Sequence, residues 1–421
     1  MAALADAAGG RWLGHPPDDA HATGVSIDTR TLKPGEVYVA IRGERFDGHD
    51  FVPRAFEAGA AAAIVERETD AAGPTLLVHD AVAALQQLAS VWRAVVDHGG
   101  CRVIAVGGSN GKTTTRHLIH TVLSRGGLTG TQSPKSFNNH LGVPLTLLSA
   151  RPEHDFVVVE VGTNHAGEVA ALAAIVRPDA AVVTAIGREH LEHFGSLEAV
   201  AREELSLLDF VKDGGPRWTP RDPPPPFDGV VNLPGEHQRG NAALAAAIGR
   251  WMGVRESDIE LALAEVQPLP GRGVVHVFPG AVGLAVIDDT YNANPDSMLA
   301  ALSVLRDLDA RRRVAVLGDM FELGDHAAPG HDEVTRAAVD VADDVTLVGD
   351  AFAAAATRLG LAARVLPALD ASDLTSIVDT WRDGDVVLVK GSRGMRMERV
   401  IAAYTDRRAA AATAREAGRR R

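Results

Sequence analysis

Cysteine is nearly absent from this chain of 421 residues, in which Cys101 stands alone. A single cysteine excludes an intrachain disulfide and a metal site made of several cysteines, and it fits a reducing cytoplasm. The stretch MAALADAAGGRWLG at the amino terminus has no basic region followed by an apolar core, and charges interrupt even the alanine-rich stretches elsewhere. We therefore expect no secretory signal, no membrane insertion and a cytoplasmic location.

Positive charge is also scarce. The chain has 42 Lys and Arg against 55 Asp and Glu, which gives a net charge of −13. This balance disfavours nucleic acid and anionic membranes as partners, so any phosphate must be bound by local groups. The content of 46% hydrophobic and 23% charged residues is typical of a globular protein, and the length allows roughly two to four domains.

Strand and helix patterns divide the chain into parts. A small α/β unit has strand patterns at 36–41 and 61–66, and a helical pattern over 81–98 leads out of it. Beyond it, buried-strand patterns alternate with helical ones, which is typical of a parallel, doubly wound sheet. The proline-rich stretch 214–229 predicts a loop rather than a helix or a central strand.

A second boundary is expected at the PLPGRG stretch, 268–273, after which strand-to-loop junctions recur. Ligands in such sheets bind at the carboxyl ends of the strands, so we expect function at these junctions. The predicted domains are 1–97, 98–267 and 268–421.

The strongest local pattern is VIAVGGSNGKTTTRHL, in which an apolar strand, a glycine turn and a helix follow one another. The glycines let successive backbone N–H groups point at phosphate oxygens, Lys112 supplies a charge, and Thr113 can bind Mg²⁺. Val106 occupies the first glycine position of the strict motif, so a glycine-rich turn with a chance lysine stays an alternative. The residues expected to bind a nucleoside triphosphate are Gly108, Ser109, Asn110, Gly111, Lys112, Thr113 and Thr114.

Two further residues are candidates for a metal site. Glu160 ends the buried-strand pattern FVVVE, where a carboxylate in a phosphate-loop domain can reach Mg²⁺; a surface acid near a turn is the alternative. His190 follows the next strand pattern, and an isolated histidine with no ligand is its alternative. The string REHLEH is not HExxH, so a zinc peptidase is not supported.

Several motifs together resemble those of the Mur ligases of bacterial peptidoglycan synthesis. The motifs, in family order between about residues 24 and 400, are VGGSNGKTTT, SFNNHLGVPLTLL, VEVGTNHAGE, EHLEHFGS, DDTYNANPDSM, VAVLGDMFELG and LVKGSRGMRME. The resemblance is greatest to the branch that adds D-alanyl-D-alanine to UDP-N-acetylmuramoyl-tripeptide.

This resemblance implies an α/β protein of three domains. These are an amino-terminal domain for the UDP substrate, a central P-loop ATPase sheet and a Rossmann-like carboxy-terminal domain. It also implies that ATP, with Mg²⁺, phosphorylates a peptide carboxylate, and that an amine attacks the acyl phosphate. We expect a monomer whose domains close over the site.

The resemblance also assigns roles to residues. ATP would contact Asn241, Arg272, Asp289 and Asn292, and Glu160 and His190 would bind metal. The expected substrate-binding residues are Ser26, Asp28, Arg30, Asn138, Asn139, Asn294, Lys390, Ser392 and Arg393. Simpler alternatives are a surface ion pair for Asp28 with Arg30, turns or helix caps for the asparagines, and a solvated turn for the KGSR stretch.

The chain departs from the family in two places. Glu204 stands where Mur ligases generally carry a carbamylated lysine, and we expect it to replace the carbamate at the second Mg²⁺; a surface helix acid is the alternative. Only thirty residues separate Glu204 from Gly235, where the family continues with further strands. A related ligase for another acid and amine, and a nucleotide-binding homologue without ligase activity, therefore stay open beside the D-alanyl-D-alanine ligase.

Overall fold

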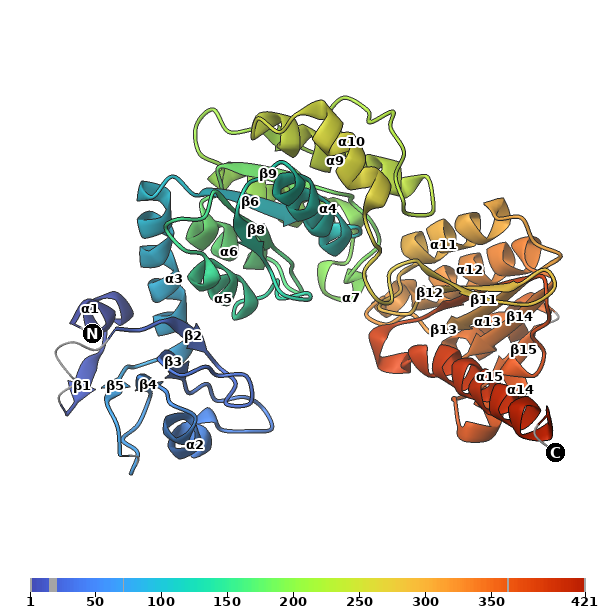
Figure 1. The fold of residues 1–421 in the computed structure, drawn as a ribbon, viewed down its shortest axis with the longest axis horizontal. Coiled ribbons are helices and arrows are strands. Elements are labelled where there is room, and N and C mark those ends of the chain that lie inside the picture. The colour runs from blue at the N-terminus through green and yellow to red at the C-terminus, as the bar shows by residue number, and fades with distance from the viewer. Residues whose placement is uncertain (1, 15–20, 71, 362, 420–421) are drawn as a thin grey trace. The chain divides into compact units, whose positions relative to one another are not determined.

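A computed structural model describes residues 2–14, 21–70, 72–361 and 363–419. Within these residues the strands form three sheets, each covered by helices (Figure 1). The chain divides into two compact units, and each is described by itself. The first unit comprises Met1–Ala185, Arg202–Pro224 and Leu244–Ile259; the second comprises Ile186–Ala201, Pro225–Ala243 and Glu260–Arg421.

The amino-terminal sheet has five strands in the order β1-β5-β4-β3-β2, and β1 alone runs antiparallel to its neighbour. Side chains of β3 and β4 are almost all buried, which explains why these apolar runs form its centre. The elements are α1 (Ala2–Ala8), β1 (Arg11–Leu13), β2 (Gly24–Ser26), β3 (Glu36–Val39), η1 (Gly48–Phe51), α2 (Val52–Glu57), β4 (Ala62–Val65) and β5 (Thr75–Leu77).

The central sheet also has five strands, all parallel, in the order β10-β9-β6-β8-β7. Because β6 lies in the middle, its carboxyl end opens onto the loops that follow β8 and β9. The elements are α3 (Ala81–His98), β6 (Arg102–Gly107), α4 (Lys112–Arg125), β7 (Gly130–Gln132), α5 (Gly142–Ser149), β8 (Phe156–Glu160), α6 (Glu168–Val176), β9 (Ala180–Val183), α7 (Leu191–Phe194), α8 (Leu197–Leu205), η2 (Ser206–Phe210), β10 (Arg217–Trp218), α9 (His237–Trp251) and α10 (Glu256–Glu265).

The carboxy-terminal sheet has six strands in the order β11-β12-β16-β13-β14-β15, with only the edge strand β11 antiparallel to its neighbour. Helices pack on both faces, as in a doubly wound fold. The elements are β11 (Val274–Phe278), β12 (Leu284–Asp289), α11 (Pro295–Asp307), β13 (Arg312–Gly318), η3 (Gly324–His326), α12 (Ala327–Val341), β14 (Asp344–Val348), α13 (Asp350–Leu359), β15 (Arg364–Leu366), α14 (Ala371–Val378), β16 (Asp385–Lys390), η4 (Arg393–Met395) and α15 (Glu398–Arg419).

Most elements confirm the sequence patterns, including a helix over 81–98 and alternating strands and helices beyond it. The proline-rich stretch 214–229 differs in one respect, because Arg217 and Trp218 form the short strand β10. This strand lies at the sheet edge, where proline nearby removes no ladder hydrogen bond. The boundaries near residues 98 and 268 stay predictions.

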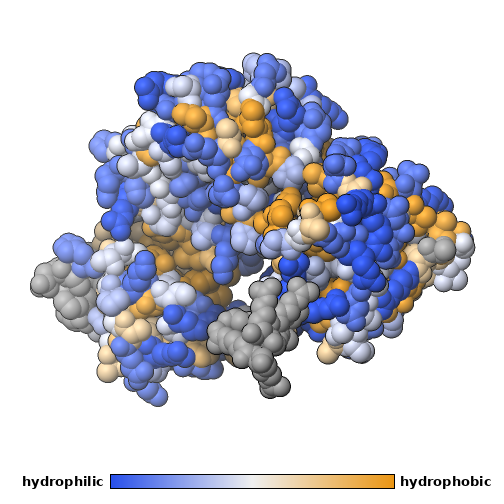
Figure 2. All heavy atoms as spheres, turned by 45° about the vertical axis from the view of Figure 1, so that its right-hand side comes forward, coloured by the Kyte–Doolittle hydropathy of each residue, from blue (hydrophilic) through white to orange (hydrophobic). Residues whose placement is uncertain are grey.

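Hydrophilic and hydrophobic residues are interspersed on the face drawn in Figure 2. Among the helices in the described ranges, none is both long and apolar enough to cross a membrane.

Helix α3 belongs to two hydrophobic cores. Its first half, including Ala84 and Leu85, is buried with the amino-terminal sheet, and its second half, including Ala89 and Val96, is buried with the central sheet. The Asp80 side chain accepts the Ala83 N–H at 2.9 Å and so caps the start of this helix. One continuous helix therefore holds the two sheets of the first unit together.

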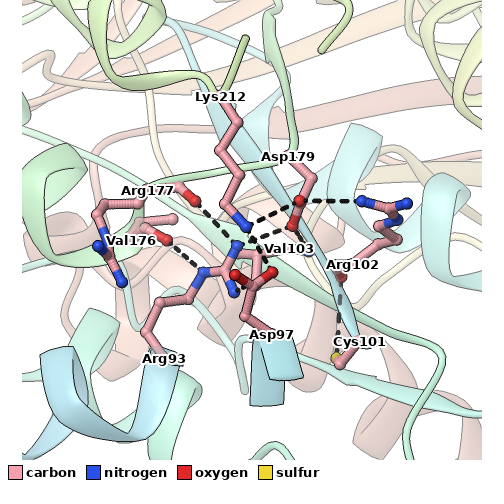
Figure 3. Close-up of polar contacts among 9 residues, drawn as sticks. All are labelled: Arg93, Asp97, Cys101, Arg102, Val103, Val176, Arg177, Asp179 and Lys212. Carbon is pink, nitrogen blue, oxygen red and sulfur yellow. Dashed lines mark hydrogen bonds and ion pairs between the residues drawn. The ribbon is translucent and has the colours of Figure 1, made fainter. Parts of the chain in front are cut away.

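A buried arginine on α3 fixes the other end of this joint (Figure 3). Arg93 is fully buried and donates to the Val176 and Arg177 carbonyls at the end of α6, and to Asp179 Oδ2 at 2.8 Å. Asp179 also accepts the Val103 N–H at 2.8 Å. The guanidinium thus neutralises a buried carboxylate and caps a helix carboxyl terminus at once.

Replacing Arg93 with alanine leaves Asp179 buried with weaker partners, so we expect the unit that holds it to lose about 3–5 kcal/mol of unfolding free energy in urea titrations. Arg102→Ala is the matched control: this arginine also pairs with Asp179, at 3.3 Å, but its side chain is 55% exposed. We expect it to cost less than about 1 kcal/mol. Equal losses for the two variants would contradict the role given to Arg93.

Candidate functional site

The phosphate loop connects the carboxyl end of β6 to the start of α4. Gly111 caps the helix with a φ of 85°, and Gly108 has a φ of 114°, a region that side chains disfavour. Lys112 Nζ donates to the Gly108 carbonyl, so the lysine folds back over the loop. Backbone N–H groups at a helix amino terminus beside a lysine are suited to bind an anion, and the binding of phosphate by this loop stays a prediction.

The end of β9 holds this loop in place. Thr184 Oγ1 donates to the carbonyls of Gly107, at 3.1 Å, and Asn110, and the Ser109 N–H donates to the Ala185 carbonyl at 2.8 Å. A Cβ on Gly108 would lie 2.4 Å from Thr184 Oγ1. The close approach, and not only the positive φ, therefore requires glycine here.

Glu160 is the centre of a polar cluster at the end of β8. Its Oε1 accepts Thr113 Oγ1 at 3.1 Å and Asn138 Nδ2 at 3.0 Å, and its backbone N–H donates to Ser133 Oγ. Its Oε2 lies 3.3 Å from Arg116 Nε. Glu160 is 1% exposed, so the alternative of a surface acid is wrong.

Sequence reasoning missed Arg116, a buried residue on the first turns of α4. It also donates to Gln132 and to the Lys135 carbonyl, and so joins β7 and the loop after it to the phosphate-loop helix. An arginine inside the helical pattern, four residues beyond Lys112, is the sequence feature that marks it.

The donors at Glu160 suit Mg²⁺. This ion prefers oxygen ligands, and proteins usually hold it with one or two carboxylates while substrate phosphates and water complete the shell. The Glu160 carboxylate and the Thr113 hydroxyl are such ligands, and they lie 3.1 Å apart beside the phosphate loop. Among the described residues there is no group of three or more His, Cys, Asp or Glu side chains that could hold a metal ion.

Glu204 lies against the phosphate loop. It is 2% exposed, and its Oε2 accepts the Gly108 N–H at 2.6 Å, so the alternative of a surface helix acid is wrong. The neighbouring Glu203 has a different task, because its carboxylate accepts the Gly167 and Val169 N–H groups, each at 2.8 Å. Glu203 thus caps α6, whereas Glu204 faces the nucleotide loop.

His190 lies in the segment 186–201, which belongs to the second compact unit, whereas Glu160 belongs to the first. A metal site shared by these two residues stays a prediction. Within its unit, His190 Nδ1 lies 2.7 Å from Glu322 Oε2.

The carboxy-terminal candidates gather at strand ends, as predicted. Lys390, at the end of β16, is 3% exposed, and its Nζ donates to Asp289 Oδ2 at 2.6 Å and to the Asn292 carbonyl at 2.8 Å. Ser392 is also buried and accepts the Phe321 N–H. The alternative of a solvated turn is therefore wrong for Lys390 and Ser392.

Two arginines share one aromatic ring. The guanidinium carbon of Arg272 lies 4.1 Å from the ring centre of Tyr291, and that of Arg393 lies 5.7 Å from it. Such cation–π contacts hold the charges at the loop that follows β12.

A second amide cluster starts α9. Asn241 Nδ2 donates to Gln238 Oε1 at 2.9 Å, and both side chains are buried. Next to them, burial lowers the pKa of His237, so its imidazole is neutral near pH 7.

Several predicted substrate residues have local partners. Arg30 pairs with Asp28 at 2.6 Å and holds the pKa of that carboxyl at about 2, and Ser26 Oγ donates to the Asp28 carbonyl. Asn139 accepts the Gly142 N–H at 2.9 Å near the start of α5, and Asn294 forms a capping box at the start of α11. The alternatives are confirmed as an ion pair for Asp28 with Arg30, a turn for Asn139 and a helix cap for Asn294.

Comparisons with known proteins agree with this geometry. Three family models match: "Mur ligase family, catalytic domain" over residues 21–93, "Mur ligase middle domain" over 106–224, and "Mur ligase, glutamate ligase domain" over 275–393. The UDP-N-acetylmuramoyl-tripeptide–D-alanyl-D-alanine ligase of Escherichia coli K12 is 33% identical over 431 aligned positions, covering 91% of this chain and 93% of that protein. The chain belongs to the Mur ligase family.

Solved Mur ligases show the same architecture. A crystal structure of MurF from Acinetobacter baumannii matches with a TM-score of 0.84 and 31% identity, covering 96% of this chain and 98% of that one. The MurF ligase of Thermotoga maritima in complex with ADP matches with a TM-score of 0.77 and 26% identity, covering 92% and 98%. The three sheets are therefore those of a three-domain Mur ligase.

The close contact at Gly108 predicts that Gly108→Ala displaces the phosphate loop and weakens ATP binding at least about tenfold in calorimetric titrations, since a lost cluster of phosphate hydrogen bonds exceeds 1.4 kcal/mol. Gly127→Ala is the matched control: its φ of 86° is also positive, but nothing lies within 4 Å of its Cβ position. We expect it to bind ATP like the wild type. Unchanged ATP affinity in Gly108→Ala would show that the loop does not bind the nucleotide.

Proposed function

We propose that this chain is an ATP-dependent ligase that joins D-alanyl-D-alanine to UDP-N-acetylmuramoyl-tripeptide in peptidoglycan precursor synthesis. The observation that carries the proposal is the match to the Escherichia coli ligase of that name across 91% of the chain. The phosphate loop beside Glu160 supports the use of ATP. On this proposal the chain acts in the cytoplasm as a monomer.

The reaction has two steps. A carboxylate oxygen of the tripeptide attacks the γ-phosphorus of ATP, the bond to the β-phosphate oxygen breaks, and ADP leaves with that electron pair. The amine of D-alanyl-D-alanine then attacks the acyl carbon of the acyl phosphate, inorganic phosphate leaves, and the nitrogen loses a proton. Phosphorylation is needed because a free carboxylate would have to expel oxide.

The residues of the site divide this work. The loop amides and Lys112 hold the phosphates and offset charge on the transferring group. Thr113, Glu160, His190 and Glu204 would hold Mg²⁺, which supplies further positive charge there when bound. Arg272, Asp289, Asn292 and Asn241 would contact ATP from the carboxy-terminal side.

The remaining candidates would bind the two substrates. Lys390 is anchored by Asp289, so it presents its charge at a fixed point on the strand-end loop. Together with Ser392 and Arg393 it would line the acceptor side. Ser26, Asp28 and Arg30 would hold the UDP end, and Asn138, Asn139 and Asn294 would contact the rest of the substrate.

Phosphate release from ATP separates this function from its alternatives. We expect release only when UDP-N-acetylmuramoyl-tripeptide and D-alanyl-D-alanine are both present, because each reactant is needed to complete turnover. Release with another acid and amine, but not with these, would indicate a related ligase. Tight ATP binding without release in any mixture would indicate a nucleotide-binding protein without ligase activity.

Glu204 predicts a carbon dioxide response unlike that of a lysine-bearing Mur ligase. A glutamate has no amine to carbamylate, so wild-type turnover should be unchanged in buffer freed of dissolved CO₂. Glu204→Ala should lower ATP turnover by at least about tenfold, whereas Glu198→Ala, an exposed acid on the same helix, should not. Glu204→Lys should regain activity as bicarbonate is added. If Glu204→Ala keeps wild-type turnover and Mg²⁺ dependence, Glu204 does not replace the carbamate.

A further inference from the structure

Residues 186–201 follow β9 of the central sheet in sequence, yet they pack within the second compact unit. The main anchor is Arg188. Its backbone N–H donates to Asp296 Oδ2 at 2.7 Å, and its guanidinium donates to Asp296 Oδ1 through Nε at 3.0 Å and Nη2 at 2.7 Å. The same guanidinium pairs with Glu333 at 2.5 Å. Helices α11 and α12 therefore hold the segment that carries His190.

The loop after β13 reaches the imidazole itself. Glu322 Oε2 lies 2.7 Å from His190 Nδ1, and the Glu192 N–H donates to the Glu322 carbonyl at 3.3 Å. Gly324 approaches the same segment so closely that a Cβ would lie 2.9 Å from the Cα of Glu192. Backbone and side-chain contacts thus fix Glu322 against the histidine.

Both residues have strained backbones. His190 has a φ of 51° and Glu322 a φ of 63°, in the left-handed region that residues with a side chain seldom adopt. Strain of this kind costs roughly 1–3 kcal/mol and persists only where the surroundings enforce it. The Nδ1 atom of His190 and the Oε2 atom of Glu322 lie 2.7 Å apart. Two strained residues in contact indicate that the surrounding structure enforces this pairing.

Hydrogen bonds anchor the start of the loop that carries the exposed Glu322. The Asp319 carboxylate accepts the Ala351 and Phe352 N–H groups at the start of α13, at 3.0 and 2.9 Å. The Met320 N–H donates to Nε2 of the buried His331 at 3.0 Å. The motif LGDMFELG therefore forms a loop whose first residues are anchored by hydrogen bonds. Its Glu322 side chain is partly exposed and contacts His190.

We propose that Glu322 is a positioning residue for His190. By accepting the Nδ1 proton it fixes the imidazole tautomer and leaves the Nε2 lone pair for a metal ion. Carboxylates commonly orient metal-binding histidines in this way. The other ring nitrogen, Nε2, lies 3.5 Å from Glu189 Oε1, so a second carboxylate lies near the nitrogen that would bind the metal.

This inference rests on the proposed function only in taking His190 as a metal ligand. If so, the loop after β13 of the carboxy-terminal sheet orients the imidazole of His190, a residue that the sequence analysis assigns to the central domain. Metal affinity would then depend on a residue that touches neither metal nor nucleotide.

Binding of Mn²⁺ alone to the full chain tests the proposal, with the free ion followed by its paramagnetic resonance signal. We expect the dissociation constant to rise about tenfold in Glu322→Ala, similar to the rise in His190→Ala. Glu322→Gln should lie between Glu322→Ala and the wild type, because its carbonyl accepts the Nδ1 proton without the charge. Asp325→Ala, which removes an exposed acid from the same loop, is the matched control and should bind like the wild type.

Three results would overturn the proposal: wild-type affinity in Glu322→Ala, wild-type affinity in His190→Ala, or equal weakening in Asp325→Ala, which would indicate a general charge effect. Glu322→Gln keeps the shape of the side chain, so it tests the idea even if the alanine variant folds poorly. Phosphate release by the wild type is measured separately. Failure of that assay would overturn the proposed ligase reaction while leaving the Mn²⁺ result to decide the role of Glu322.

Discussion

The hydrogen bond from the Gly108 amide to Glu204 holds the first turn of the phosphate loop, on which the proposed nucleotide chemistry of this chain depends. Thr184 fixes the same loop from β9, and Glu160 gathers Thr113 and Asn138 beside it. On the proposed function, a chain with a net charge of −13 needs such a local arrangement, because its overall field repels the anionic ATP and UDP groups. On the proposed function, local amides, Lys112 and a metal ion would supply the attraction.

The sequence was sufficient to predict the strands, and the candidate residues at their ends, where the pattern of apolar residues and the strand-end position determine them. Buried runs such as those of β6, β8 and β16 are strands because only a doubly covered sheet hides so many apolar residues. Within each sheet, the polar residues that follow parallel strands lie at the same edge of that sheet. This is why Glu160 could be chosen as a candidate from its strand-end position, whereas Lys390 was a candidate through the resemblance to the Mur ligases. The phosphate loop could be predicted in the same way, because the GKTT sequence follows such a strand.

Tertiary contacts decided what the sequence could not. Arg116 resembles an ordinary helix residue until the fold places Glu160 3.3 Å from it, and Arg93 resembles a surface charge until α3 buries it against Asp179. The partner of Glu204 is a backbone amide 96 residues away, and that of His190 is a carboxylate on the loop after β13. No local pattern encodes such pairs. They also explain how two adjacent acids, Glu203 and Glu204, come to serve a helix cap and a nucleotide loop.

The central claim is that the chain activates a carboxylate as an acyl phosphate. Its most direct test uses UDP-N-acetylmuramoyl-tripeptide labelled with ¹⁸O in the reacting carboxylate, with ATP and D-alanyl-D-alanine, and mass spectrometry of both products. The account predicts an amide product that keeps one labelled oxygen and inorganic phosphate that carries the other. Phosphate released without the label, or the absence of the amide product, would contradict it.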